Sequence, residues 1–272
     1  MNRLIFIFLT IVSNLSAQPA IIEIIAGNNT ESTYESRIKL VPKLERLSLG
    51  ENERITLLRF LTRHSATDRA SEGELATLKN DTADILLDRY PNWNELYESL
   101  LSSMIAEDQG TIWPSYILQK LPRIIQQTSS DEIRAQALSL LWATAENVVH
   151  PDCATALISL YQLHSNPDVL DRDQFSALLL LIADDNRAEL SARTTALEYS
   201  ARLGDPEAKE LAIQYLKTSQ PATLKTAAIG VFTIMGTPSD ESALMPYTRS
   251  QDIRVRSAAV NAIKTIRNRN SE

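Results

Sequence analysis

Apolar residues along most of the chain recur at intervals of three and four, with polar residues between them. Four segments before residue 128 show this pattern, with less regularity than the segments after it: 51–64, 72–89, 93–108 and 111–127. Side chains at these intervals lie on one face of an α-helix. The pattern therefore predicts a series of amphipathic helices joined by short loops.

The C-terminal half repeats one such helix. Three segments align without gaps: LSARTTALEYSARLGD (190–205), ATLKTAAIGVFTIMGT (222–237) and IRVRSAAVNAIKTIRN (253–268). Their basic residues Arg193, Lys225 and Arg256 fall in register, 32 and 31 positions apart, and alanine follows each of them after three residues. Gly204 and Gly236 stand where the first two helices are expected to stop.

A second helix follows each of the first two copies. One begins at Asp205 with Pro206 in its first turn, and the next contains Pro246, which predicts a bent or irregular helix. An earlier copy of the repeat lies around Arg134, 59 residues before Arg193, so we expect one degenerate unit between them. The strongly apolar segment DRDQFSALLLLIADD (171–185) fills this gap, and the sequence assigns it no partner helix.

Helix pairs of this kind cannot bury their apolar faces alone, so neighbouring pairs stack around a shared core. We therefore predict an all-α solenoid over residues 36–272, preceded by a flexible or loosely packed segment, 18–35. Asp252 is expected to cap its own helix, and Arg256 to reach an acidic or carbonyl group nearby. The same bracing role is predicted for the equivalent residues Arg134, Arg193 and Lys225.

At these positions the chain resembles the HEAT-repeat, armadillo-like family of exported bacterial type. The resemblance rests on Asp252, Val255, Arg256, Ala258, Ala259, Ala262 and Ile266, and on the equivalent positions of the earlier copies. It implies a right-handed α-α superhelix of stacked antiparallel helix pairs. Such superhelices are used mostly to bind other proteins.

The N-terminus, MNRLIFIFLTIVSNLSAQPA, has the pattern of a secretory signal peptide. Arg3 precedes an apolar run, 4–12, and small residues follow at Ser16 and Ala17. The run is shorter than the roughly 20 apolar residues of a membrane-spanning helix. We therefore expect cleavage after Ala17, a periplasmic or secreted protein, and no membrane attachment after removal of residues 1–17.

Composition narrows the choice of partner. The 272 residues include 27 basic and 34 acidic side chains, a net charge of −7, which disfavours nucleic acid because phosphate neutralisation drives that binding. Cys153 is the single cysteine, so no internal disulfide can form, and we interpret it as a buried thiol on a helix.

No catalytic or metal-binding pattern is found in the sequence. His64, His150 and His164 occur singly, without the spacing of metal ligands. The carboxylates within 171–173 and 183–186 stand at helix ends, where acidic residues are ordinary caps. We therefore predict no metal, no cofactor and no enzymatic activity.

Tyrosines of the second helices are the candidate contact residues. Tyr215 and Tyr247 each follow their unit's basic residue by 22 positions, and Tyr161 lies on the second helix of the earlier unit. Two interpretations remain open: an aromatic contact strip for a partner, or rings packed between repeats with only the hydroxyls at the surface.

The favoured function is thus an exported binding or scaffold module for a protein partner. The alternative is a structural or inhibitory subunit that associates with copies of itself, and the oligomeric state is left open. An enzyme with a site in the solenoid groove is the least favoured class, because the sequence shows no catalytic constellation.

Overall fold

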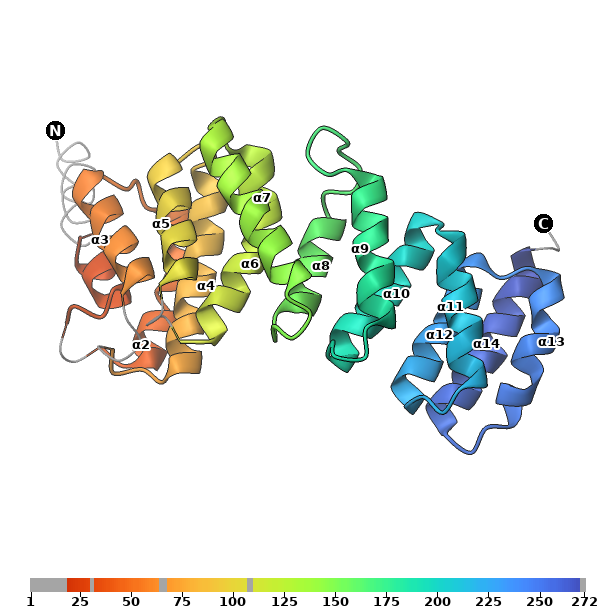
Figure 1. Ribbon diagram of the computed structural model, residues 1–272. Helices are drawn as coiled ribbons and strands as arrows, with labels where there is room; N and C mark the ends of the chain where they lie inside the picture. Colours follow the sequence, from red (N-terminus) through yellow and green to blue (C-terminus); the bar gives the residue numbers. More distant parts are fainter. Residues whose placement is uncertain (1–18, 30–31, 64–67, 107–109, 270–272) are drawn as a thin grey trace, which may run out of the picture. The chain divides into compact units, whose positions relative to one another are not determined.

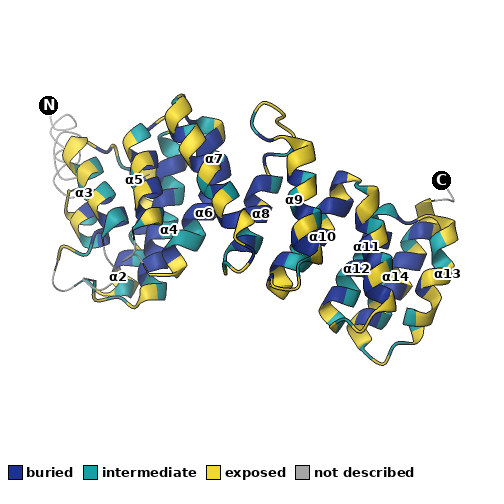
Figure 2. Ribbon diagram, viewed as in Figure 1, coloured by how far each residue is buried: buried dark blue, intermediate teal, exposed yellow. Residues whose placement is uncertain are grey.

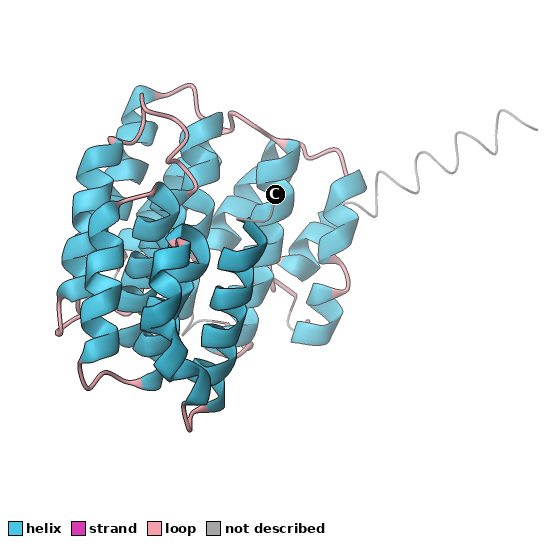
Figure 3. Ribbon diagram, turned by 90° about the vertical axis from the view of Figure 1, so that its right-hand side faces the viewer, coloured by secondary structure: helices cyan, strands magenta, loops and turns pink. Residues whose placement is uncertain are grey.

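The computed structural model describes residues 19–29, 32–63, 68–106 and 110–269. Within these ranges every regular element is a helix, and Figure 3 shows them joined by loops with no strand. The all-α prediction is therefore confirmed. The predicted signal peptide, residues 1–17 with its cleavage site after Ala17, lies outside the described residues.

The chain divides into two compact units, Met1–Ser139 and Leu140–Glu272 (Figure 1). The division falls within α7 (Asp131–Glu146). The first unit also contains α2 (Tyr34–Ile38), η1 (Val41–Arg46), α3 (Glu51–Thr62), α4 (Glu72–Arg89), α5 (Asn94–Ile105) and α6 (Ile112–Gln127). The second contains α8 (Cys153–Tyr161), α9 (Arg172–Asp184), α10 (Leu190–Leu203), α11 (Pro206–Lys217), α12 (Ala222–Met235), η3 (Pro238–Asp240), α13 (Glu241–Leu244), η4 (Met245–Arg249) and α14 (Ile253–Arg269).

In the first unit each helix buries one stripe against its neighbours (Figure 2). α3 packs on α5, α4 packs on α6 and η1, and α5 packs on α6. Part of the segment 18–35 is packed: residues 19–25 are helical, and Ile22, Ile25 and Ala26 are 1% exposed or less. The apolar patch of this segment is large enough to join the core.

The second unit shows the repeat directly. α10 packs on α12 and α12 on α14, and the equivalent alanines Ala196, Ala228 and Ala259 are fully buried. Small side chains at these positions let the helix backbones approach closely. Each of these helices also packs on the helical segment before it, so that α9 finds its partner in α10, α11 in α12 and η4 in α14. Each unit thus has the neighbour-on-neighbour packing of an all-α helical solenoid.

In this unit α10 and α12 end at the glycines that the sequence predicts, but the two glycines are needed for different reasons. Gly204 ends α10 in the left-handed conformation, with φ of 81°. Gly236 ends α12 with φ of −66°, and it is needed for space instead: a Cβ there would lie 2.3 Å from the Phe232 carbonyl oxygen and 2.7 Å from Ile266. The predicted irregular helix around Pro246 is confirmed, because that stretch breaks into η3, α13 and η4.

Position 229 and position 260 offer a matched test of this packing. Both stand four residues after the basic residue of their copy, but Ile229 is fully buried and Val260 is 50% exposed. Ile229→Ala is expected to lower the free energy of unfolding by about 2–5 kcal/mol, since it opens a cavity in the core. Val260→Ala is expected to change it by less than about 0.5 kcal/mol. Urea unfolding followed by circular dichroism measures both, and equal effects would contradict the assignment of the core.

Candidate functional site

Three arginines of the repeat reach back to the carbonyl end of the preceding helix. Each is the fourth residue of its own helix, in α7, α10 and α14. The bonds run from Arg134 Nη2 to Thr128 O (2.8 Å), from Arg193 Nε to Ala183 O (3.1 Å) and from Arg256 Nη1 to Ser250 O (2.7 Å). A cation at this place satisfies carbonyls that have no partner within their helix and opposes the negative end of the helix dipole.

The other two residues of the predicted brace behave differently. Asp252 accepts hydrogen bonds from the backbone N–H groups of Arg254 (2.8 Å) and Val255 (3.4 Å), and so caps α14. Lys225 is the fourth residue of α12, but its side chain has no hydrogen bond or ion pair with any residue in the described part of the chain. The brace expected at Lys225 is therefore corrected: its single ammonium group does not replace the guanidinium fork at this position.

Tyr215 lies in the core and is only 2% exposed. Its hydroxyl donates to the Ala183 carbonyl at the end of α9 and accepts from Arg193 Nη2 at 3.0 Å. Burial raises the pKa of this phenol, although the hydrogen bond from Arg193 opposes the rise. Of the two interpretations left open for Tyr215, the structure supports packing between repeats and not a contact strip, because its ring is covered by protein.

The other two tyrosines are half-buried and do not form a ladder of rings. Tyr247 donates its hydroxyl to the Leu216 carbonyl at the end of α11, at 2.5 Å, which is the equivalent of the bond from Tyr215 to α9. Tyr161 stacks instead on Tyr199, with ring centroids 4.0 Å apart, and on His164, at 4.4 Å. Tyr215 and Tyr247 thus contact α9 and α11 through hydrogen bonds of their hydroxyl groups, whereas Tyr161 contacts its neighbours by ring stacking.

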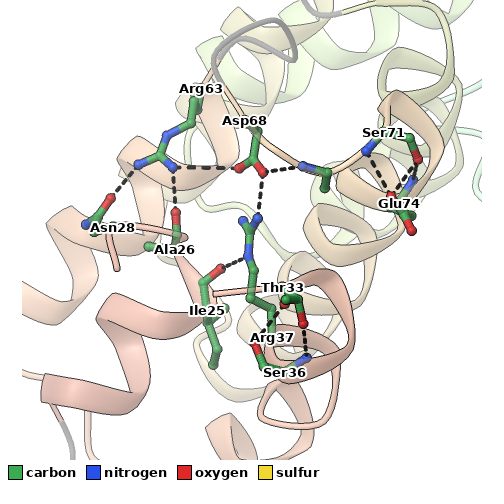
Figure 4. A network of polar contacts seen from close by, with 11 residues as sticks. Ile25, Ala26, Asn28, Thr33, Ser36, Arg37, Arg63, Asp68, Ser71 and Glu74 are labelled. Atoms are coloured by element: carbon green, nitrogen blue, oxygen red, sulfur yellow. Dashed lines mark hydrogen bonds and ion pairs between the residues drawn. The ribbon is translucent and has the colours of Figure 1, made fainter. Parts of the chain in front are cut away.

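In the first unit a buried ion pair ties the N-terminal segment to the chain before α4 (Figure 4). Arg37 Nη1 lies 2.7 Å from Asp68 Oδ1, and the two side chains are 2% and 3% exposed. Arg37 also donates through Nε to the Ile25 carbonyl at 3.0 Å, and Arg63 donates to the Ala26 carbonyl at 2.6 Å. These arginines cap the helical residues 19–25 and stabilise their packing against the rest of the first unit.

The charge state of Asp68 follows from these partners. Burial by itself would raise the pKa of the carboxyl group. Hydrogen bonds from Arg37 and from the Ala70 backbone, together with the charges of Arg37 and Arg63, outweigh burial and hold the pKa below its ordinary value. Asp68 is therefore ionised at neutral pH and contributes its stability there.

Cys153 begins α8, is 1% exposed and donates its thiol hydrogen to the Ala145 carbonyl. Burial raises the pKa of this thiol to about 11, so the reactive thiolate is scarce at neutral pH. His150 accepts a hydrogen bond from the Asp152 backbone and belongs to the turn before α8. Across the described residues, no group of three or more His, Cys, Asp or Glu side chains could hold a metal ion, and no helix is long and apolar enough to cross a membrane.

An open groove runs between α9 and α11. It consists of two adjoining hollows of about 720 and 840 Å³, which share Leu180, Pro206 and Glu207. One face of each helix lines it, at the spacing of an amphipathic helix. The lining side chains of these faces are Asp173, Ser176, Ala177, Leu180, Leu181 and Asp184 on α9, and Pro206, Glu207, Glu210, Leu211 and Gln214 on α11.

Leucines form the floor of the α9–α11 groove. α9 carries four consecutive leucines, Leu178–Leu181, which point all around the helix. The core takes Leu179, which is fully buried, whereas Leu181 is 59% exposed. Sequence reasoning singled out this apolar run but not its exposed side, although a helix that is apolar all round signals a second contact face.

Acidic side chains form the rim of the groove. Asp173, Asp184, Glu207 and Glu210 are exposed and have no ion pair with any residue the structure describes. Two arginines lie close, but both have other partners. Arg187 pairs with Asp185 at 2.6 Å, and its hydrogen bonds lower the pKa of that carboxyl group to about 2; Arg172 donates to the Leu203 carbonyl. The bond to a neutral carbonyl leaves the charge of Arg172 in place, but the four free carboxylates outnumber it, so the net charge of the rim is negative.

Comparison with protein-family models and with curated proteins finds no match for this chain. The candidate site thus rests on its geometry: an exposed leucine floor, two adjoining hollows and a rim of unpaired carboxylates. The HEAT-like resemblance stays a prediction from the repeated residues.

Arg193 and Lys225 test the arginine cap, because they hold the same repeat position. Arg193→Met is expected to lower the free energy of unfolding by about 1–3 kcal/mol, since it leaves the Ala183 carbonyl and the Tyr215 hydroxyl short of a partner. Lys225→Met is expected to change it by less than about 0.5 kcal/mol. Thermal and urea unfolding of the two variants measure the difference, and a Lys225→Met cost as large as that of Arg193→Met would refute the cap.

Asp68→Asn tests the buried ion pair. At pH 7 we expect a loss of about 3–5 kcal/mol in the first unit, because Arg37 keeps a buried charge without its partner. The folded pKa of Asp68 is lowered, so its stabilisation is complete above the unfolded value of about 4 and is lost as the pH falls through the folded value. The gap between wild type and variant should therefore shrink in acid.

Asp88→Asn is the matched control, since its ion pair with Arg123 belongs to the same unit but leaves Asp88 69% exposed. It should cost less than about 1 kcal/mol at pH 7. Unfolding measured from neutral pH down to acid distinguishes the two aspartates, and a gap for Asp68→Asn that does not change with pH would count against the assigned pKa.

Proposed function

We propose that this chain is an exported binding or scaffold module for a protein partner and has no catalytic activity of its own. The observation that carries the proposal is the α9–α11 groove with its exposed Leu181. Exposed leucine in contact with water is unfavourable, and an apolar floor within a polar rim is typical of interaction surfaces.

The shape of the groove favours a macromolecular partner over a small molecule. Small-molecule sites are concave and enclose most of their ligand. The α9–α11 groove instead follows two helices through adjoining hollows of about 720 and 840 Å³. An elongated segment of a protein can contact both hollows at once. Export through the N-terminal signal would place this surface in the periplasm or outside the cell.

A comparison of two exposed aliphatic residues tests the proposal. Leu181 and Val149 both belong to the second unit and are 59% and 62% exposed, but only Leu181 lines the groove. Leu181→Asn and Val149→Asn should each leave stability within about 0.5 kcal/mol of wild type. We expect a partner from the periplasmic or extracellular fraction of the source cells to be retained by wild type and Val149→Asn and lost by Leu181→Asn.

The same three proteins separate the possible results. Quantitative mass spectrometry after affinity capture measures partner recovery, and light scattering measures self-association. A second copy of the chain as partner would give a mass above one chain that only Leu181→Asn reduces. Identical recovery and identical mass for all three proteins would show that the groove binds no protein.

A further inference from the structure

We infer that the α9–α11 groove accepts a basic segment of its partner, one that carries lysine or arginine beside an aliphatic side chain. This inference rests on the proposed function and adds the chemistry of the partner. It follows from two features that coincide: a leucine floor that needs an apolar cover, and a rim in which the free carboxylates outnumber the one free guanidinium of the described lining residues, that of Arg172.

The rim carboxylates are available to a partner. Asp184 ends α9, and Glu207 and Glu210 lie on the first turns of α11. All three are exposed, and none has an ion pair with a described residue. Asp205 differs, because it caps α11 by accepting from the Glu207 backbone at 2.9 Å and also accepts from Ser176 Oγ at 2.5 Å. With Asp173 on the other hollow, four carboxylates of the rim are thus free, whereas Asp205 serves the fold.

The floor strengthens the effect of these charges. Between the two acidic helix faces Leu181 is exposed and Leu180 is half-buried, and Leu211 lines the same hollow although it is only 9% exposed. A cleft lined by one sign of charge with low-dielectric walls focuses the field and raises the local concentration of counter-charges. A cation held over this floor would be less screened than on a flat surface, and its aliphatic neighbour would cover Leu181.

The negative charge is a property of this groove and not of the whole unit. A third hollow, of about 480 Å³, lies over α10 and α12 and is lined by Glu198, Arg202 and Arg254 among others. Its charges are mixed and internally paired: Glu198 with Arg202 at 2.7 Å, and Arg254 with Asp252 at 3.1 Å. The α9–α11 groove differs from this third hollow in combining unpaired carboxylates with exposed leucine.

A pair of synthetic probes tests the inference on the full chain. One is a short amphipathic peptide with lysine on its polar face and leucine on its apolar face, and the other has glutamate in place of every lysine. Fluorescence anisotropy is expected to show binding of the Lys/Leu peptide, weaker at higher salt, and far weaker binding of the Glu/Leu peptide. The double variant Asp184→Asn/Glu210→Gln should weaken binding of the Lys/Leu peptide about tenfold.

Asp168→Asn/Glu189→Gln is the matched control, because both residues are exposed, belong to the second unit and lie outside the groove lining. It removes the same charge and should change binding less than about twofold. Equal losses in the two double variants, equal binding of the two peptides, or no binding of the Lys/Leu peptide would each overturn the inference. If these results were found but capture of the partner still depended on Leu181, only the inference about a basic segment would be wrong. If the peptides bound as expected but capture did not depend on Leu181, only the proposed function would be wrong.

Discussion

The carbonyl ends of the helices set the main constraint on this fold. Stacked helices bury their ends, and a buried carbonyl without a donor is costly. Because the chain has only 7 glycines, side chains from other helices supply many of these donors. They are Arg37 and Arg63 for residues 19–25, Arg89 for η1, Lys79 for α3, Arg134 for α6, Cys153 for α7, Arg193 for α9, Arg172 for α10, Tyr247 for α11 and Arg269 for α12. Each cap is also a tertiary contact, so it fixes the register of one helix on another.

This constraint explains which parts of the structure were predictable. The cap needs a long donor at one place in each copy, so it leaves a basic residue in register at Arg193 and Arg256, which sequence alone can detect. The 22-residue offset likewise placed Tyr215 and Tyr247 at equivalent positions. Their exposure was not predictable, because it depends on how closely successive second helices approach, and no residue pattern within one helix reports that distance.

The groove lies beyond sequence reasoning for the same reason. α10 and α12 approach closely over buried alanines such as Ala196 and Ala228. α9 and α11 instead leave a groove between them, so the leucine run of α9 faces both the core and solvent. Four consecutive leucines are more than one buried face of α9 can hold, and the sequence shows this. Only the packing of the helices shows which leucine stays exposed. The packing of residues 19–29 was also not predictable from that segment alone. Its carbonyl groups at Ile25 and Ala26 are bound by Arg37 and Arg63, which lie outside it.

Fold and candidate site meet in the last turn of α9. Ala183 offers the carbonyl that Arg193 and Tyr215 bind from the inner side, while Asp184, the next residue, faces the groove. A carboxylate at the carbonyl end of a helix is unfavourable, because both carry negative charge. The guanidinium of Arg193 offsets that cost, so the cap allows α9 to present Asp184 to a partner. Positions on the inner side are held by the repeat, whereas those on the rim can change without loss of the fold. Differences in binding between proteins built on this repeat should therefore concentrate on the outer faces of α9 and α11.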